Sequence, residues 1–463
     1  MNVIQHTKFL WLLLFFIPIM VCAQDEVIEK TDTTTQPKLV VTLEDLISKT
    51  LEISPQISSG QYSLEEAQAN YARASRAGIL PKVDFSVYGG VVPDTPDNIG
   101  PDFNFPSSGL FDNDSWGPFI RMKLEAIQPI YTFGKISNLK KAASMGVLAG
   151  QEDITRARNE MILHAKKAYY TLANLYSYLD FVEDLIGRAQ KAVDIVQDKL
   201  EKRSSEVTDI DLMRIEVFQS ETKRKKIEIE HNIEFVQMTL KILMGLPRET
   251  PVDIVDHRIR MQEKTMEGVD HFLYIAKNKR PEIKQLDYLV QAKKYLMQEK
   301  KAQLKPDFGI AGEWNFGSAP GREDIDNPFL VNSYNIHNAG GTLFLKQNLS
   351  FHRLDADYKK SRAAFEKSKA DQQAALQGIE VQIRNAYTEV VAKYDSFEHS
   401  KVAFKKVRSW VLATTLNFGV GVVPPKELVE AFVAYSKVKN EYLDTLYDYQ
   451  IAVANLEFAV GGD

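Results

Sequence analysis

The chain has 463 residues, of which 44% are hydrophobic and 26% are charged, and its formal net charge is −5 at pH 7. This composition is typical of an ordered protein rather than a disordered one. The mild net acidity gives no reason to expect a nucleic acid as a partner, because proteins that bind nucleic acids carry basic surfaces.

The N-terminus has the pattern of a secretory signal peptide. Lys8 is followed by an apolar run, and small residues stand before Gln24. The pattern predicts that residues 1–23 are removed by cleavage after Ala23, and the run is too short for a membrane span. Cys22 is the only cysteine and would leave with this peptide. The alternative is a lipoprotein with an acylated Cys22, which the bulky residue before it disfavours.

Residues 24–42 are expected to form a flexible N-terminal segment, and two copies of one plan follow it. Each copy has a Pro-x-Ile start, a charged helix, a Leu-Pro or Leu-x-Pro break, two strands, a very long helix, a tip and a final helix. The copies span 43–245 and 271–463, and residues 246–270 form a linker between them. Such a tandem repeat predicts two structurally similar halves.

The elements are expected in the following order. The first copy contains a helix at about 55–78, strands at about 80–92 and 117–130, a long helix at 134–202, a tip at 203–207 and a helix at 208–244. The second copy begins with a helix and continues with strands at about 306–317 and 339–350, a long helix at 352–416, a tip at 417–425 and a helix at 426–460.

The two long helices indicate a coiled-coil assembly. Apolar or small residues recur every three or four positions along 134–202, as on one stripe of a helix, over roughly 100 Å at 1.5 Å per residue. In each copy, the two shorter helices together match the long one in length. Each copy is therefore predicted to be a pair of parallel rods, of which one is continuous and the other is made of two pieces.

The strands alternate apolar and polar residues. Val83, Phe85 and Val87 alternate with Asp84 and Ser86. This pattern suits a transmembrane barrel strand, but it also suits a soluble sheet with one face on a core. Four strands cannot close a membrane barrel, so membrane strands would require several chains to share one barrel. The apolar faces of the other strands carry Ile120, Met122, Leu124, Ala126, Phe308, Ile310, Trp314 and Phe316.

The signal peptide, the duplicated halves and the ending "NFGVGVVPPKELVEAFVAYSKVKNEYLDTLYDYQIAVANLEFAVG" resemble the TolC family of outer-membrane efflux proteins. The resemblance runs from about Leu43 to Gly461. The first tip departs from the pattern, because Ser204, Ser205 and Glu206 stand where the family usually has a glycine. The resemblance implies a mainly α fold with a β-barrel contribution, in which long coiled-coil hairpins accompany four antiparallel strands per chain.

The resemblance also implies a homotrimer with a twelve-stranded barrel in the outer membrane and an α-helical tunnel in the periplasm. Residues 24–50 and 245–270 would wrap the middle of the tunnel. The protein would be a passive, porin-like exit duct for tripartite efflux or type I secretion, engaged by a periplasmic adaptor and an inner-membrane pump. The pump would choose the cargo. The alternative function is a periplasmic coiled-coil scaffold or an adaptor without a channel.

The apolar second tip is expected to contact the adaptor, because exposed apolar patches mark partner surfaces. The alternative is an ordinary turn between helices, in which the valines pack locally. The tip residues are Phe418, Gly419, Val420, Gly421, Val422, Val423 and Pro424.

The resemblance places an acidic periplasmic gate at Glu427 and Glu430, with Asp209 at the matching place in the first hairpin. Three copies would form rings of carboxylates that select cations. The alternative is that these acids only favour the helix dipole. Val423 replaces an arginine that can lock the closed state in the family.

An enzyme is not expected. The sequence contains no Walker loop, no glycine-rich dinucleotide turn and no H-E-x-x-H or C-x-x-C spacing. Its eight histidines are scattered without the spacing of metal ligands. The sequence therefore predicts no catalytic residues, no bound metal and no cofactor.

Overall fold

The structure is a computed structural model that describes residues 38–93, 116–205, 207–261, 267–320 and 334–462. The expected signal-peptide cleavage between Ala23 and Gln24 lies outside the described residues. No helix in the described part of the chain combines the length and the hydropathy that a membrane crossing requires.

The two sequence copies fold into matching series of elements. The first copy contains α1 (Leu43–Ile53), α2 (Pro55–Arg76), β2 (Lys82–Pro93), β3 (Trp116–Tyr131), α3 (Lys135–Glu201) and α4 (Asp209–Leu243). The second copy contains α5 (Val269–Lys279), α6 (Pro281–Ala302), β5 (Asp307–Ser318), β6 (Ile336–Lys346), α7 (Phe351–Gly419) and α8 (Pro425–Ala459). The mainly α fold with four antiparallel strands is confirmed. The short helices α1 and α5 are additions to the expected elements.

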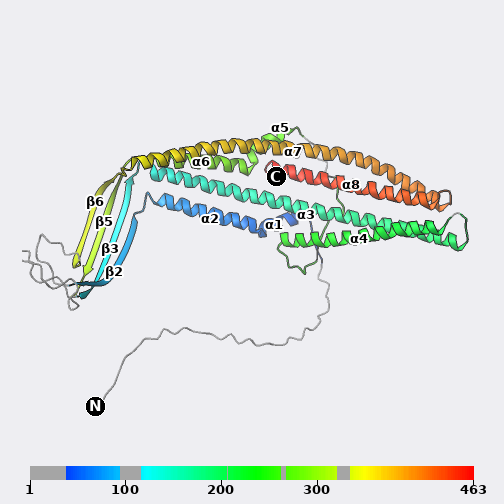
Figure 1. Cartoon of the computed structure of the whole chain (residues 1–463), viewed down its shortest axis with the longest axis horizontal. Helices are drawn as coiled ribbons and strands as arrows, with labels where there is room; N and C mark the ends of the chain where they lie inside the picture. Colours follow the sequence, from blue (N-terminus) through cyan, green and yellow to red (C-terminus); the bar gives the residue numbers. More distant parts are fainter. Residues whose placement is uncertain (1–37, 94–115, 206, 262–266, 321–333, 463) are drawn as a thin grey trace, which may run out of the picture. The chain divides into compact units, whose positions relative to one another are not determined.

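The helices pair as their lengths predicted. The long helix α3 has 67 residues and packs along both α2 and α4, while α7 has 69 residues and packs along both α6 and α8 (Figure 1). The helix α3 also contacts α6 and α8, which joins the two copies. The core between these helices includes the fully buried side chains of Leu172, Leu185, Ile215, Leu240, Leu428 and Phe432.

Two expected boundaries are wrong. The helix α7 continues to Gly419 rather than ending at 416, because amides beyond 416, such as that of Val420, donate to its last carbonyl oxygens. The second tip is therefore 420–424 rather than 417–425. The strand β6 covers 336–346 rather than 339–350, because its pairing with β5 starts at Ile336 opposite Gly317 and ends at Lys346 opposite Asp307.

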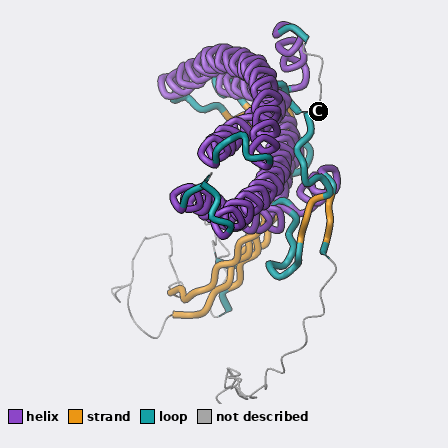
Figure 2. The backbone as a smooth tube through the Cα atoms, turned by 90° about the vertical axis from the view of Figure 1, so that its right-hand side faces the viewer, coloured by secondary structure: helices purple, strands orange, loops and turns teal. Residues whose placement is uncertain are grey.

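The four strands form one antiparallel sheet in the order β2–β3–β5–β6 (Figure 1). Figure 2 shows the strands in orange beside the purple helices. One face of the sheet is apolar and open. Val83, Phe85 and Val87 are 55%, 59% and 51% exposed, so this face does not pack on a core formed by the described residues. The same face of the other strands exposes Ile120, Leu124, Phe308, Ile310, Leu343 and Leu345.

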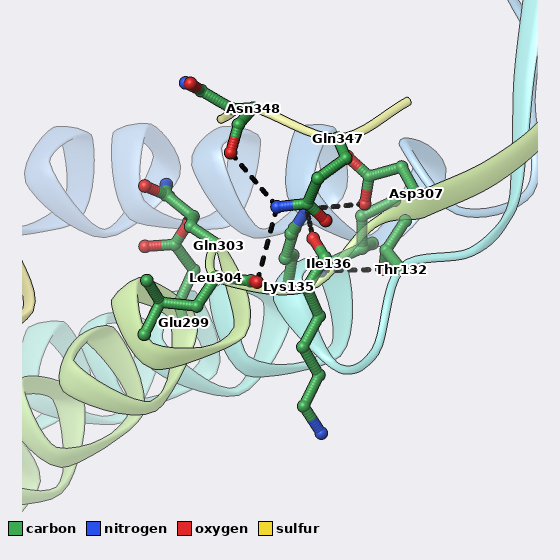
Figure 3. A network of polar contacts seen from close by, with 10 residues as sticks. Thr132, Lys135, Ile136, Glu299, Gln303, Leu304, Asp307, Gln347 and Asn348 are labelled. Carbon is green, nitrogen blue, oxygen red and sulfur yellow. Dashed lines mark hydrogen bonds and ion pairs between the residues drawn. The ribbon is translucent and has the colours of Figure 1, made fainter. Parts of the chain in front are cut away.

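A polar network fixes the corner where strands meet helices (Figure 3). The Lys135 amine at the start of α3 pairs with Asp307 of β5 at 2.8 Å and donates to the carbonyl oxygen of Lys305 at 2.9 Å. The amide of Gln347 donates to the carbonyl oxygens of Leu304 and Asn348. The network joins the β3–α3, α6–β5 and β6–α7 connections, so it sets the direction of the sheet relative to the long helices.

The prediction that residues 24–42 form a flexible segment is wrong for the last residues of this range. Residues Leu39–Val41 form strand β1, which pairs in parallel with β4 (Val252–Ile254) of the linker. The pairing holds because Asp253 of β4 is buried, with 5% exposure, and needs a counter-charge that Lys38 provides at 2.7 Å. The sheet pairing and the ion pair between half-exposed Lys38 and buried Asp253 both oppose the loss of chain entropy on ordering this segment.

The Asp253 carboxylate is saturated with donors. It accepts hydrogen bonds from the hydroxyl of Tyr176 at 2.5 Å and the backbone amide of Ile254 at 2.9 Å, and its other oxygen lies 3.1 Å from Nε2 of His257. Burial by itself would raise the pKa of Asp253, but Lys38, Tyr176 and the Ile254 amide outweigh it and hold this pKa below its ordinary value. We call Lys38, Tyr176, Asp253 and His257 the N-terminal clasp.

We expect Asp253→Asn to loosen strand β1. The change removes charge-assisted hydrogen bonds worth on the order of 2 kcal/mol, so hydrogen exchange at the Leu39 and Val255 amides should become about thirtyfold faster. Asp256→Asn is the control, because Asp256 accepts a hydrogen bond from Tyr169 nearby but does not contact Lys38. Equal protection of β1 in both variants would contradict the role of the clasp.

The same clasp gives a pH dependence. Since the folded-state pKa of Asp253 is depressed, its stabilisation is fully present above the unfolded pKa of about 4 and is lost as the pH falls through the folded value. Exchange at β1 should therefore accelerate only under acid conditions below about pH 4, after correction for intrinsic rates.

Candidate functional site at the hairpin tips

The second tip is a tight turn that depends on glycine. The amide of Val422 donates to the carbonyl oxygen of Asn417 at 2.9 Å, and the amide of Gly421 donates to that of Phe418 at 3.1 Å. Gly421 has a φ of +79°, in the left-handed region. This pattern is a Schellman cap, in which glycine avoids the strain that a side chain would cause.

The first tip uses the same turn with an arginine in the glycine position. Arg203 has a φ of +53°, and the amide of Ser204 donates to the carbonyl oxygen of Lys199 at 3.0 Å. Arg203 therefore occupies the turn position that glycine occupies in the second tip. The sequence had suggested Ser204, Ser205 and Glu206 for this position. The left-handed backbone of a non-glycine residue stores roughly 1–2 kcal/mol of strain at this tip.

One residue of the second tip is buried, and most of the others are exposed. Phe418 is 2% exposed and belongs to the helix core, so its expected contact with a partner is wrong. Val420 and Val422 are 75% and 72% exposed, so these two valines do not pack locally. Gly419, Gly421 and Pro424 are also exposed, and Val423 is half-buried.

The two hairpins pack against each other where α4 and α8 begin. The rings of Phe218 and Phe432 stack with centroids 5.8 Å apart. Beside them lies a groove of about 350 Å³ between α4 and α8. Its apolar lining consists of Ile210, Met213, Val217, Phe218, Val429 and Val433.

Sequence reasoning missed this groove. Ile210, Met213 and Val217 are 62%, 60% and 59% exposed, although they recur at helical spacing like core residues. The available signal was a second apolar stripe on α4, offset from the buried stripe that contains Ile215 and Phe218. A helix with two apolar stripes has two faces to cover. The helices α3 and α8 pack on α4, but among the described residues the stripe of Ile210, Met213 and Val217 stays exposed.

The three expected gate acids lie near the tips: Asp209 is in the first turn of α4, Glu427 in the first turn of α8 and Glu430 in its second turn. Asp209 is the first residue of α4, whose N-terminus Thr208 and Asp211 cap reciprocally. Glu427 and Glu430 lie on exposed positions of α8, three residues apart and therefore on one face. The structure thus places all three acids at the beginning of neighbouring helices and leaves each open to solvent. Lys426 is 3.9 Å from Glu430, in an exposed pair that contributes little.

No group of three or more histidine, cysteine, aspartate or glutamate side chains in the described residues is arranged to hold a metal ion.

Comparison with known proteins places this geometry in a family. The family model described as outer membrane efflux protein matches residues 46–224 and 272–462, which correspond to the two copies. A search of curated proteins returns no match.

Solved structures share the fold at low sequence identity. The CusC structure, described in terms of folding and transmembrane channel formation, is 16% identical, covers 92% of this chain and 94% of its own, and has a TM-score of 0.71. The outer membrane protein VceC of Vibrio cholerae is 16% identical, with coverages of 91% and 96% and a TM-score of 0.69. The CmeC outer membrane channel of Campylobacter jejuni is 17% identical, with coverages of 91% and 85% and a TM-score of 0.69.

The family match covers most of the chain, and the duplicated hairpins, the four-stranded sheet and the solved outer-membrane channels agree with it. The expected resemblance to TolC-like proteins is confirmed, and with it the outer membrane as the location and transport rather than catalysis as the activity. The chain belongs to the outer membrane efflux protein family.

Proposed function

We propose that this protein is a homotrimeric exit duct, engaged by a periplasmic adaptor and an inner-membrane pump, for tripartite efflux or type I secretion. The observation that carries the proposal is the sheet. In the described residues of one chain, β2 and β6 are edge strands of 12 and 11 residues, and the apolar face between them is open. Long open edges are templates for pairing with further strands.

An assembly of three copies would pair the open strand edges and cover the apolar face. If β6 of each copy pairs with β2 of the next, the sheet closes into a twelve-stranded barrel and no edge remains. The apolar face then contacts lipid and the polar face lines the lumen. The long helices continue from the same corners, so closure of the barrel also brings α3, α4, α7 and α8 of three copies into one ring. A periplasmic scaffold or adaptor would leave the apolar face of this sheet exposed to water, so the sheet does not favour that alternative.

The tips supply the surface for the adaptor. The exposed Val420 and Val422 project from a turn that backbone hydrogen bonds fix, so they can be buried by a partner without the cost of ordering a loop. The duct itself is passive, and the pump supplies both the energy and the choice of cargo. Interaction with the tips couples the pump to the duct.

The assembly is tested by the mass of the detergent-solubilised particle from the outer membrane. We expect three copies of a chain whose first residue is Gln24, because removal of the signal peptide precedes assembly. Mass photometry and N-terminal sequencing measure both quantities. A monomeric particle, or a protein recovered in the soluble periplasmic fraction, would refute the duct.

The tip contact is tested with a pair of valine variants. We expect Val420→Asp with Val422→Asp to abolish export in cells while the trimer still assembles, because charges would be buried against an apolar partner surface. Val420→Ile with Val422→Ile keeps the surface apolar and should retain export. Gly421 variants are less informative, because a side chain at φ +79° strains the turn itself. Export by the aspartate variant would contradict the contact.

The gate is tested by bilayer recordings. We expect Glu427→Gln with Glu430→Gln to lower cation selectivity and to weaken block by multivalent cations, because two rings of carboxylates lose their charge. Glu441→Gln is the control, since it lies on nearly the same face of α8 about four turns further along. If the double variant keeps the selectivity and the block of the unmodified channel, the acids serve only the helix dipole.

A further inference from the structure

The polar face of the sheet contains a row of three carboxylates. Asp84 of β2 pairs directly with Glu125 of β3, and Glu125 pairs directly with Glu313 of β5. Like charges opposite one another on neighbouring strands destabilise a sheet. An arrangement of this kind therefore requires counter-charges close by.

Two lysines of the same face provide these counter-charges. The Lys82 amine lies 2.6 Å from Asp84. The Lys123 amine lies 2.5 Å from Glu125 and 3.8 Å from Glu313, so one cation serves two carboxylates. The amide of Asn315 also donates to Glu313 at 2.5 Å. Lys123 is thus the residue that holds the middle of the row together.

The row remains open to water and ions. Lys123, Glu125 and Glu313 have side chains 33%, 41% and 47% exposed. The fourth strand adds no charge at this level, because Gly340 of β6 pairs with Glu313 and a Cβ at Gly340 would meet nothing within 4 Å. A hollow of about 410 Å³ lies there, lined on its polar side by Glu125, Glu313, Asn315, Asn338 and Thr342.

We propose that the row of Asp84, Glu125 and Glu313 is a charge filter of the barrel, and that Lys123 determines its selectivity. The proposal rests on the proposed trimer, in which the polar face lines the lumen and the row recurs in each of three copies. Charged rings in a low-dielectric wall raise the local concentration of ions of opposite sign. This filter lies in the sheet and is separate from the acids at the helix tips.

Removing the positive charge of the row and removing its negative charges should shift the ratio of potassium to chloride permeability in opposite directions. Lys123→Ala leaves the carboxylates of Glu125 and Glu313 without their shared cation, so the ratio of potassium to chloride permeability should rise by about twofold or more. Glu125→Gln with Glu313→Gln leaves the charge of Lys123 unbalanced, while Asp84 still pairs with Lys82, so the same ratio should fall by a similar factor. A purely structural role of these side chains would not give shifts of opposite sign.

The experiment uses the purified full-length protein in planar bilayers under a potassium chloride gradient. All variants are made in the Glu427→Gln and Glu430→Gln background, so that the tip acids do not dominate the reversal potential. Ser86→Ala is the matched control, because Ser86 lies opposite Lys123 in the register and carries no charge. Lys123→Arg should retain the original selectivity.

The outcomes separate this inference from the proposed function. If the unmodified chain forms no trimeric channel, the proposed function fails. If it forms channels and the Lys123→Ala and Glu125→Gln/Glu313→Gln variants shift selectivity in the same direction, or not at all, the charge filter is refuted. The glutamine pair removes repulsion and keeps the side-chain shape, so it should assemble even if Lys123→Ala does not. An unchanged permeability ratio in the glutamine pair alone overturns the proposal.

Discussion

The edges of the four-stranded sheet impose the constraint on which the rest of the structure depends. A strand edge exposes a row of unpaired amide and carbonyl groups, and in a hydrocarbon environment each unsatisfied group costs several kcal/mol. Among the described residues of one chain, the sheet has two such edges, on β2 and β6, together with an open apolar face. In the proposed trimer, closure of the barrel removes the edges, and the corner network around Lys135 and Asp307 links the ends of β3, β5 and β6 to the long helices.

The duplicated sequence supplies the regularity that such a closed assembly needs. Each copy contributes two strands, one continuous helix and two shorter helices that lie along it. The copies differ at their tips, where the strained Arg203 takes the position of Gly421. The first tip is therefore the less stable turn, and the second carries the exposed valines. In the proposed duct, this difference favours the second hairpin as the site of contact with the adaptor.

Charge is concentrated at two levels of the proposed duct. Glu427, Glu430 and Asp209 begin the helices next to the tips, whereas Asp84, Glu125 and Glu313 form a row in the sheet. The tip acids are exposed and only weakly paired, while the sheet acids are held by Lys82 and Lys123. In the proposed duct, a permeating ion would therefore meet exposed acids near the helix tips and, in the sheet, carboxylates that are paired with lysines.

The sequence by itself determined the local and periodic features. The helical stripe of α3, the alternation of Val83, Phe85 and Val87, the duplication and the glycine turn at Gly421 all depend on neighbours close in the chain. Only the tertiary structure decided which tip residues are exposed, that Phe418 is buried and that Arg203 adopts the glycine backbone. The same holds for the β1–β4 pairing, the groove between α4 and α8 and the carboxylate row. These features join residues far apart in the sequence, and strand register and helix packing, which no local pattern encodes, bring them together.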